Sequence, residues 1–585
     1  MEQRRTGTHW AGEYPEGVPR HVEIPDEDFL VGFSRAVTAH PNRAATWFEG
    51  RVTTYAELAD AVSRGAAALA ALGVTPGDRV AIALPNCLAH VTAFLAVLRL
   101  GAVAVEHNPL STAEELERQL VDSGAVVAVC WQPTAGRVAE VQERTSVRTL
   151  VAVDVSKDLP TAKRLALRLP VRKARETRAR LTSPSPSGSL DWHTLVRDAA
   201  HLDHGHPRPA PDDLAALLYT GGTTGNPKGA MLTHRNLVAN PVMGEAWTGL
   251  SAQDAEPAVV YAALPLFHAY GLTLCLGFGL RIAATVVLFP RFDAAAVLAA
   301  QRIVPATFMP VVPPMLDRLT AAAREAADRG DPVDLTSLRF VMSGAMPLPA
   351  ATAAAWEALT GSFVIEGYGL TECSPIALGN PFTAQRRPGW LGVPFPSTDV
   401  RVADQEDPAA DVPPEERGEL LVSGPQVFRG YWGRAAENEG VLWTDDEGTT
   451  WLRTGDVVVQ DEQGFVRLVD RIKEMIIAGG FKVFPSQVED VLRDMPGVAD
   501  VAVVGLPGGD LGEQVVAAIV PDDAGRAHEA VLDLDAVRTW CEGRLARYAI
   551  PRQVVLLEEL PRSMIGKVLR REVRAHLLDQ RPTAG

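Results

Sequence analysis

The segment YTGGTTGNPKGA, Tyr219 to Ala230, gathers four glycines, three threonines and one lysine. Glycines let backbone N–H groups approach an anion closely, threonine hydroxyls add donors, and Lys228 adds a positive charge. A Walker A loop needs its lysine directly after the last glycine, whereas here Lys228 precedes Gly229. The segment therefore predicts a phosphate-binding loop of another kind. Taken alone, it is equally typical of a surface turn.

The length and composition of the chain predict a globular protein with two or more domains. It has 585 residues, which is too long a chain for a single hydrophobic core. Hydrophobic residues make up 47% of it, enough to form buried cores. Its formal net charge is -16, which argues against a nucleic-acid partner, because such proteins need a dominant basic surface. We expect no binding to DNA or RNA.

Cysteine placement and the N-terminal sequence predict a cytoplasmic protein. The cysteines show no CxxC spacing, and the first residues contain no apolar core of a signal peptide. The longest apolar run, residues 271–290, is interrupted by Arg281 and predicts a buried helix followed by a strand rather than a membrane span.

Helix and strand patterns alternate through the first half of the chain. An amphipathic helix is predicted after Thr54 and ends near Gly73, and the strand RVAIAL follows. Thr112 and Glu115 form a T-x-x-E capping box that opens another helix. This alternation predicts an α/β fold with helix-covered parallel or mixed sheets.

The pattern changes after Asp470 to a small α+β unit. Its first helix is predicted to be capped by Ser486 and Glu489, and the strands VADVAVV, QVVAAIV and RQVVLL follow. We place the boundary in the charged stretch DRIKE. The expected organisation is an N-terminal tail, a large domain, a small domain and a C-terminal tail, at residues 1–28, 29–470, 471–577 and 578–585.

Lysine is rare in this chain, since only seven of the 56 basic residues are Lys. Lys157, Lys163 and Lys173 lie in one basic segment; the others lie in glycine-containing motifs, at Lys228, Lys473, Lys482 and Lys567. A compact ammonium group is not interchangeable with a guanidinium where one oxygen must be contacted. The four motif lysines are therefore candidate functional residues.

Further motifs follow the glycine loop in a fixed order. They are LPLFHAYG (Leu264–Gly271), SGAMPLP (Ser343–Pro349), EGYGLTECSP (Glu366–Pro375), WLRTGD (Trp451–Asp456), DRIKEMIIAGGFKVFPSQVE (Asp470–Glu489) and LPRSMIGKVLRR (Leu560–Arg571). From about Phe29 to Leu577, the chain resembles the adenylate-forming superfamily of acyl-CoA synthetases, luciferases and peptide-synthetase adenylation domains.

This resemblance implies a site for ATP. The implied ATP or AMP contacts are Thr220, Gly221, Gly222, Thr223, Thr224, Gly225, Lys228, Gly344, Ala345, Glu366, Gly367, Tyr368, Gly369, Thr371, Asp456, Arg471 and Lys567. Among them, Tyr368 would lie against adenine, and Asp456 and Arg471 would contact the ribose. Glu372 would ligate Mg²⁺, a hard cation that takes oxygen ligands.

The catalytic residues implied by the resemblance are Lys228, Thr371, Glu372 and Lys567. Lys567 would bridge the attacking carboxylate and the α-phosphate of ATP. Four of the residues implied by the resemblance also have structural alternatives. Asp456 could cap a turn, Glu372 could cap a helix, Tyr368 could pack in a core, and Lys567 could be a surface lysine.

Two further sites follow from the resemblance. The acyl pocket would contain His268, Tyr270 and Gly344, and glycines at 271, 277 and 279 could leave room for a tunnel. The small domain would rotate about a hinge at Lys473 and form a channel for the CoA thiol, with Gly479, Gly480 and Phe481. Lys482 is either a substrate contact or a solvated residue.

His268 argues against an amino acid as the substrate, because relatives that activate amino acids usually carry Asp at this position. The stretch from Asn108 to Ala125 and the glycine at 221 look most like bacterial long-chain fatty acid CoA ligases. We therefore expect a ligase that converts a long- or medium-chain fatty acid, ATP and CoA to acyl-CoA, AMP and pyrophosphate.

Alternatives remain open at this stage. They are an aryl or dicarboxylic acid as substrate, a carrier protein as acceptor, a luciferase-like oxygenase, and a non-catalytic nucleotide-binding or scaffold protein. The basic segment Lys157–Arg180 also carries leucines, which suggests a peripheral membrane contact; a solvated connector is the alternative. The sequence does not give the oligomeric state.

Overall fold

The computed structural model describes residues 9–220, 227–478, 481–508, 513–527, 531–563 and 566–579. The chain forms two compact units, which are described separately below. The first contains Met1–Asp399 and Val422–Leu452, and the second contains Val400–Leu421 and Arg453–Gly585. The boundary predicted near residues 470–474 is a hinge about which one domain would rotate. The division into compact units does not describe rotation, so the hinge stays a prediction.

A seven-stranded sheet in the first unit is parallel except at one edge, where β8 and β9 pair antiparallel. Its strands, in spatial order, are β7 (Leu190–Asp191), β6 (Thr149–Val153), β5 (Val127–Trp131), β3 (Arg79–Ala83), β4 (Val103–Glu106), β8 (Leu214–Thr220) and β9 (Lys228–Thr233). The predicted strand RVAIAL is β3, near the centre of this sheet.

A nine-stranded sheet in the same unit has a parallel centre and antiparallel edges. Its strands, in spatial order, are β16 (Val393–Pro394), β15 (Ile376–Gly379), β14 (Val364–Gly369), β13 (Phe340–Ser343), β12 (Phe308–Val311), β10 (Val259–Ala262), β11 (Thr285–Leu288), β1 (Ala44–Phe48) and β2 (Arg51–Thr54). The mixed α/β prediction is confirmed.

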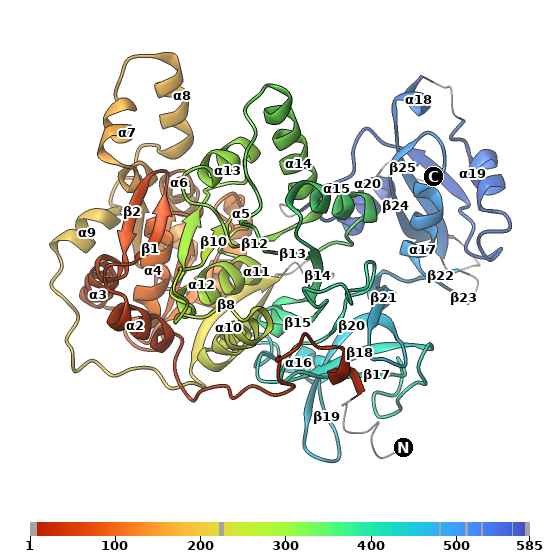
Figure 1. Ribbon diagram of the computed structural model, residues 1–585, viewed down its shortest axis with the longest axis horizontal. Coiled ribbons are helices and arrows are strands. Elements are labelled where there is room, and N and C mark those ends of the chain that lie inside the picture. Colours follow the sequence, from red (N-terminus) through yellow and green to blue (C-terminus); the bar gives the residue numbers. More distant parts are fainter. Residues whose placement is uncertain are drawn as a thin grey trace. The chain divides into compact units, whose positions relative to one another are not determined.

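Helices alternate with these strands along the first unit (Figure 1). The longer helices are α2 (Leu30–Ala39), α3 (Tyr55–Ala71), α4 (Leu88–Arg99), α5 (Ala113–Ser123), α6 (Gln132–Val141), α8 (Arg172–Leu181), α10 (His234–Thr248), α13 (Ala294–Gln301), α14 (Pro313–Asp328) and α15 (Ala350–Thr360). The shorter ones are η1 (His9–Glu13), η2 (Gln142–Arg144), η3 (Val155–Asp158), α7 (Thr161–Ala166), α9 (Trp192–Asp198), α11 (Ala269–Gly271), η4 (Leu272–Gly277), α12 (Phe278–Arg281), η5 (Thr371–Cys373) and α16 (Ala435–Val441).

Local sequence explains where several of these helices begin. Thr54 and Glu57 form a complete capping box at α3, and Thr112 and Glu115 form the predicted one at α5. Each box satisfies N–H groups that have no partner within the helix. The apolar run 271–290 forms η4, α12 and the buried strand β11, as predicted.

The second unit contains most of a five-stranded sheet and the small α+β region. The sheet has the order β17–β18–β20–β19, with β21 paired to β20. Its strands are β17 (Asp399–Ala403), β18 (Arg417–Ser423), β19 (Leu442–Thr444), β20 (Thr450–Gln460) and β21 (Val466–Arg471).

Beyond β21 the second unit contains a three-stranded sheet, a two-stranded sheet and short helices. The elements are η6 (Ile472–Glu474), β22 (Ile476–Ala478), β23 (Phe481–Val483), α17 (Pro485–Arg493), β24 (Val498–Pro507), β25 (Glu513–Pro521), α18 (Asp523–Arg526), α19 (Leu534–Cys541), β26 (Gln553–Leu556) and α20 (Arg570–Asp579). Strands β24, β25 and β26 are the three strands predicted from sequence.

The predicted cap of α17 is wrong. The residue before the helix is Phe484, which makes no side-chain cap, and Pro485 begins the helix. Ser486 and Glu489 therefore lie two residues further inside the helix than the N-cap and N3 positions that a capping box requires. Their side chains are engaged elsewhere, because both accept hydrogen bonds from Arg570.

Arg570 connects three elements of the second unit. Its guanidinium donates to both carboxylate oxygens of Glu489, at 2.7 and 2.6 Å, to Ser486 Oγ at 3.2 Å, and to Glu474. The side chain of Glu489 is 4% exposed, and that of Arg570 is 19% exposed. Because a buried carboxylate needs a counter-charge, this cluster holds α17, η6 and the start of α20 together.

Replacing Arg570 by Met is expected to destabilise the second unit by about 3 kcal/mol, because Glu489 would stay buried without its bidentate partner. Urea denaturation followed by circular dichroism measures this change. The matched control is Arg493→Met on α17, where the guanidinium also contacts Glu489 but is 50% exposed; it should change the free energy of unfolding by less than about 1 kcal/mol. An equal decrease in the free energy of unfolding in the two variants would contradict a stabilising role for the buried pair of Arg570 and Glu489.

Candidate active site

Lys228 and Thr220 lie opposite one another where β8 and β9 meet. They are paired across the antiparallel strands, and Thr220 Oγ1 is 3.5 Å from the backbone oxygen of Lys228. The predicted loop residues between them lie outside the described residues: Gly221, Gly222, Thr223, Thr224 and Gly225. The structure therefore places the two ends of the loop side by side.

A second segment runs beside β9 and brings Tyr431 to Lys228. Met231 N donates to Gly430 O at 2.9 Å, Trp432 N donates to Gly229 O at 2.8 Å, and Ala230 forms a β-bridge with Tyr431. The ammonium of Lys228 lies 5.2 Å from the centre of the Tyr431 ring, a cation–π contact. Two segments about 200 residues apart in sequence therefore form one local site.

Tyr431 also links Lys228 to Glu372. The Tyr431 hydroxyl donates to Glu372 Oε1 at 2.5 Å, and the backbone of Phe428 donates to Glu372 O at 2.8 Å. Burial and the neighbouring carboxylate raise the pKa of Tyr431, so its phenol keeps the proton that it donates. Lys228, Tyr431 and Glu372 thus form a continuous polar chain.

Helix α16 supplies a carboxylate that sequence analysis did not select. Glu437 forms an ion pair with Lys228. Arg434, just before the helix, donates to Asp122 at 2.8 Å, and Asp122 also accepts a hydrogen bond from the Tyr219 hydroxyl at 2.8 Å. The lysine predicted to bind phosphate therefore has a counter-ion within its own unit.

The carboxyl ends of β12, β13 and β14 carry another group of predicted residues. Ser343 is paired with Glu366, and Gly344 N donates to Val311 O at 3.1 Å. Parallel strands end at one edge of their sheet, where ligands commonly bind. The predicted residues of this group therefore lie at or just beyond the strand ends. Gly344 and Ala345 follow β13, residues 366–369 end β14, and Thr371 begins η5.

Ala345 and Tyr368 differ in their surroundings. Ala345 has a φ of 66°, a left-handed conformation that is uncommon without glycine. Tyr368 is 8% exposed in β14 and paired with Leu378 of β15. A buried position is compatible both with packing and with one ring face toward adenine, so the role of Tyr368 stays a prediction.

Glu366 has an unusual acidity. Burial raises its pKa to about 7, against the lowering effect of the Gly389 N–H, which donates at 2.9 Å, and of Arg386. Near neutral pH this carboxyl group is therefore present in both protonation states.

Two of the predicted acyl-pocket residues, Tyr270 and Gly344, lie close together. The Tyr270 hydroxyl donates to Met342 O at 2.8 Å, and a Cβ on Gly344 would lie 3.0 Å from that hydroxyl. His268 precedes α11, and burial lowers its pKa to about 4, so it is neutral at physiological pH. Tyr270 therefore leaves little room for a larger side chain at position 344.

The other glycines considered for an acyl tunnel are also filled by neighbours. A Cβ at Gly271 would lie 2.2 Å from Pro265 O, one at Gly277 would lie 3.2 Å from Phe29, and one at Gly279 would lie 2.8 Å from Val286. Their small size therefore serves close packing.

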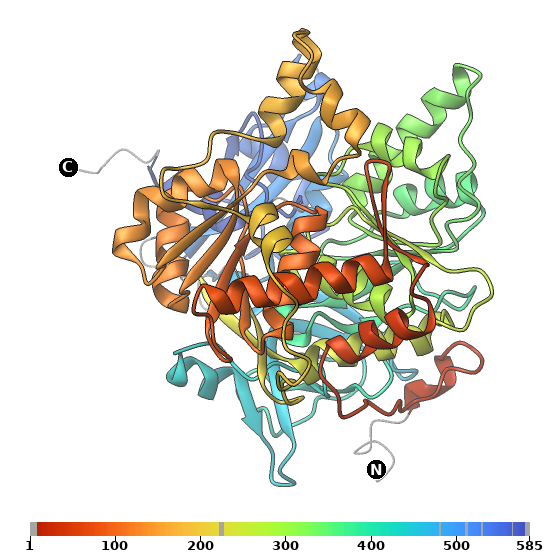
Figure 2. The same cartoon turned by 90° about the vertical axis from the view of Figure 1, so that its left-hand side faces the viewer.

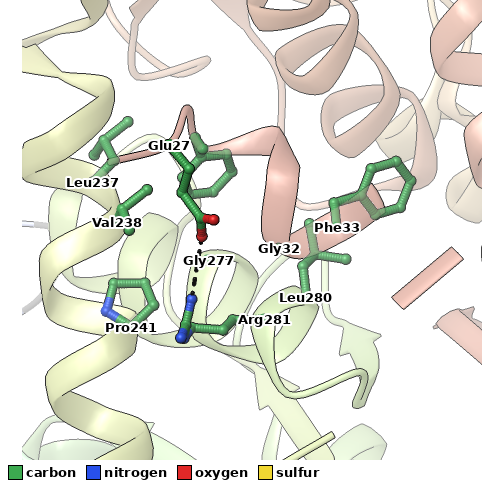
Figure 3. A pocket seen from close by; sticks show the side chains of 10 residues that line it. Glu27, Gly32, Phe33, Leu237, Val238, Pro241, Gly277, Leu280 and Arg281 are labelled. Carbon is green, nitrogen blue, oxygen red and sulfur yellow. Dashed lines mark ion pairs between the residues drawn. The ribbon is translucent and has the colours of Figure 1, made fainter. Parts of the chain in front are cut away.

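A cavity of about 10 Å³ lies among α2, α10 and α12 (Figure 3). The ion pair between Glu27 and Arg281, at 3.6 Å, lies beside it, and none of the predicted acyl-pocket residues lines it. This volume holds no more than about one water molecule. The cavity is not an acyl site.

In the second unit, Asp456 and Arg471 are cross-strand partners on β20 and β21. Arg471 Nε lies 3.0 Å from Asp456 Oδ1, and the Asp456 side chain is only 4% exposed. The backbone N–H of Asp456 donates to Thr454 Oγ1 at 3.1 Å. The sheet register thus brings together the two residues predicted to bind ribose.

Lys567 lies in the loop before α20, within the electrostatic influence of Arg471, Asp456, Glu474 and Arg570. The loop is closed by hydrogen bonds from Ser563 N to Lys567 O, at 2.8 Å, and from Lys567 N to Ser563 Oγ, at 3.2 Å. Burial and then Arg471 lower the pKa of Lys567 to about 8. Lys567 is half-buried, and its catalytic role stays a prediction.

The remaining predicted residues of the small domain are exposed. Lys473 lies in η6, Phe481 stacks on Tyr548 with 4.6 Å between ring centres, and Lys482 Nζ lies 3.3 Å from Gln405 Oε1. Gly479 and Gly480 lie outside the described residues. The hinge and the thiol channel stay predictions.

The donor set at Glu372 fits a magnesium ion that arrives with a nucleotide. In the described part of the chain, no group of three or more His, Cys, Asp or Glu side chains could hold a metal ion. The Tyr431 hydroxyl bonds to Oε1 of Glu372, and no described residue donates a hydrogen bond to Oε2. Mg²⁺ in such sites commonly takes one or two carboxylates plus phosphate oxygens. Glu372 can supply one such oxygen.

Tyr431, Glu437 and Arg570 are the residues that sequence analysis missed. Their roles come from pairing with residues far along the chain, such as Arg570 with Glu474 and Tyr431 with Glu372. The available signals were Tyr431 between Gly430 and Trp432 and Arg570 three residues after Lys567. Neither pattern identifies a partner.

Comparison with known proteins assigns the family. The profile of the AMP-binding enzyme family matches residues 33–432, and that of the AMP-binding enzyme C-terminal domain matches residues 487–567. The chain is 36% identical over 568 residues to the long-chain-fatty-acid–CoA ligase of Salmonella typhimurium, with 97% of each chain covered. It is 37% identical over 543 residues to the feruloyl-CoA synthase of Amycolatopsis sp, covering 92% of this chain and 97% of that one.

A solved structure gives the same result. The fold is similar to that of ATP-bound MatB from Rhodopseudomonas palustris, with a TM-score of 0.78, 29% identity, and 94% of this chain and 99% of that one covered. Sequence motifs, fold and full-length similarity agree. The chain therefore belongs to the AMP-binding enzyme family, the adenylate-forming enzymes that its motifs resemble.

Proposed function

We propose that this protein is an ATP-dependent ligase that joins a long- or medium-chain fatty acid to CoA. The acid is first activated as an acyl-adenylate with release of pyrophosphate, and the CoA thiol then displaces AMP. The observation that carries this proposal is the placement of Lys567, a half-buried ammonium group under the electrostatic influence of Asp456 and Arg471, the two residues proposed to bind ribose.

The first step brings two anions together. An oxygen of the fatty acid carboxylate attacks the α-phosphorus, and the bond from that phosphorus to the bridging oxygen of pyrophosphate breaks. Positioned cations and hydrogen-bond donors stabilise the charge that develops, and they need no reorganisation if they are already held in place. Lys567 is the group proposed to contact both the carboxylate and the α-phosphate.

The first unit is proposed to hold the phosphates and the metal. Lys228, Thr220 and the loop between them would contact the β- and γ-phosphates, and Thr371 would contact phosphate as well. Glu372 would ligate Mg²⁺, which neutralises phosphate charge when bound. The polar chain from Lys228 through Tyr431 to Glu372 supports this assignment, because it joins the phosphate and metal residues.

The second unit is proposed to hold the ribose and to change position between the two steps. Asp456 has two acceptor oxygens, suited to the two ribose hydroxyls, and Arg471 lies beside it. A hinge at Lys473 would withdraw Lys567 after adenylation and present residues 479–481 to the CoA thiol. This predicts a large domain of residues 29–470 and a mobile domain of 471–577.

A fatty acid is favoured over other acids because the bacterial long-chain-fatty-acid–CoA ligases match this chain over nearly its full length. A neutral His268 in the proposed acyl pocket also suits an uncharged substrate tail rather than an ammonium group. An aryl acid is the second candidate, since the feruloyl-CoA synthase matches at 37% identity.

Acid-dependent exchange between ATP and pyrophosphate tests the proposal and names the acid. A panel of fatty, aryl, dicarboxylic and amino acids should give exchange with long- and medium-chain fatty acids first, and acyl-CoA should form only when CoA is added. Faster exchange with ferulate-type acids would support the second candidate. Absence of exchange with every acid would contradict a ligase.

Lys567→Ala should abolish the exchange reaction but still convert supplied acyl-adenylate and CoA to acyl-CoA. For the wild-type enzyme, kcat/KM of adenylation should fall as pH rises through about 8, because Lys567 loses its positive charge there. Lys567→Arg keeps its charge and should give a slower but flat profile above pH 8. The same decline in both enzymes would exclude Lys567 as its cause.

We also propose that the hairpin of α7 and α8 contacts anionic lipid. Figures 1 and 2 show these helices standing out from the rest of the first unit. The exposed apolar side chains there are Leu165, Leu169 and Val171, each more than half exposed. Among the described residues, Arg168 and Arg175 form no ion pair, so their charges are available to a membrane surface. No helix in the described part of the chain is long and apolar enough to span a bilayer.

Reversing the charges of Arg168 and Arg175 to Glu should weaken binding to phosphatidylglycerol vesicles at least tenfold, since each basic residue contributes about 1 kcal/mol. The control is reversal of Arg318 and Arg324 on α14, which changes net charge equally. Vesicle co-sedimentation measures both. If the two double variants bind alike, or if the wild type binds phosphatidylcholine equally well, the hairpin is only a connector.

A further inference from the structure

We propose that Glu437 acts as a built-in competitor of the nucleotide's phosphates for Lys228. In the structure its carboxylate pairs with the ammonium group that would otherwise face the β- and γ-phosphates. The inference rests on the proposed function, because it assumes that Lys228 binds phosphate. It assigns to Glu437 control over how tightly the enzyme holds ATP and pyrophosphate.

The pairing is set by the local fold. The side chain of Lys228 is 13% exposed and that of Glu437 is 39% exposed, so the contact is partly shielded from solvent. Lys228 also lies over the Tyr431 ring, which restricts where its ammonium group can go. An ion pair in such surroundings is stronger than one on the open surface.

Helix α16 holds Glu437 in place from both sides. Asn438 Oδ1 accepts from Tyr431 N at 2.7 Å, and Asn438 Nδ2 donates to Tyr431 O at 3.0 Å. At the start of the helix, Arg434 donates to Asp122 at 2.8 Å and lies 3.9 Å from Glu437. The helix is thus fastened to the segment that carries Tyr431 and to α5.

Two anions cannot share one ammonium group without repulsion. A polyphosphate at Lys228 carries several negative charges, so the carboxylate of Glu437 must move away or tolerate a like charge nearby. In either case, phosphate binds more weakly than it would with a neutral side chain at position 437. When pyrophosphate leaves, Glu437 can pair with Lys228 again, which favours release of this product.

The opposite role for Glu437 gives the opposite result. If its carboxylate only orients Lys228 toward the phosphates, its removal would loosen the ammonium group and weaken phosphate binding. Competition predicts tighter binding and orientation predicts weaker binding. The sign of the change in affinity therefore separates the two.

The test is calorimetric binding of magnesium pyrophosphate and of β,γ-imido-ATP to the full-length protein. Glu437→Gln should lower both dissociation constants about tenfold, the size expected for removal of one charge at a partly exposed contact. AMP lacks the β- and γ-phosphates, so its dissociation constant should stay within about twofold of the wild-type value. The matched control is Glu439→Gln, an exposed position on the same helix; it should leave all three constants unchanged.

A second substitution checks that the effect passes through Lys228. In a Lys228→Met background, Glu437→Gln should no longer change pyrophosphate affinity, since interacting residues are not additive. Unchanged or weaker binding in the Glu437→Gln single variant, with Lys228→Met still reducing binding, would overturn the inference and leave the proposed function intact. No binding of imido-ATP or pyrophosphate by the wild type would instead refute the proposed function.

Discussion

Three cations, Lys228, Arg471 and Arg570, are each held by a carboxylate in the same unit, and this pairing fixes the local geometry around them. Lys228 pairs with Glu437, Arg471 with Asp456, and Arg570 with Glu489 and Glu474. Partly buried positive charges would repel one another or collapse toward solvent if they had no partners. The pair of Arg471 and Asp456 holds both side chains in position before a substrate arrives, which is the arrangement that the proposed electrostatic catalysis requires.

Lys567 has the same kind of surroundings with a different result. It lies among two cations and two carboxylates, and burial lowers its pKa to about 8. Its charge is therefore conditional, whereas the charges of Arg471 and Arg570 are permanent. In the proposed adenylation step, a substrate carboxylate and a phosphate would favour the charged form of Lys567, because nearby anions raise the pKa of an ammonium group.

The sequence predicted well those features that depend on neighbours along the chain. Thr112 and Glu115 cap α5 as expected, and the apolar run 271–290 forms a helix followed by a buried strand. The prediction failed at Ser486 and Glu489, whose capping pattern was overridden by Pro485 and by Arg570. Arg570 comes from a helix more than 80 residues later, and no local pattern reports such a partner.

The sequence by itself determined the α/β fold, the family and the identity of Lys228, Glu372, Asp456 and Lys567 as candidate residues, because spaced motifs and hydrophobic periodicity are local properties. Only the tertiary structure decided what surrounds them. The pairing of β9 with residues 430–432 places Tyr431 and Glu437 at Lys228, and the register of β20 and β21 places Arg471 at Asp456. Charge, burial and pKa depend on distances through space, which the order of residues does not contain.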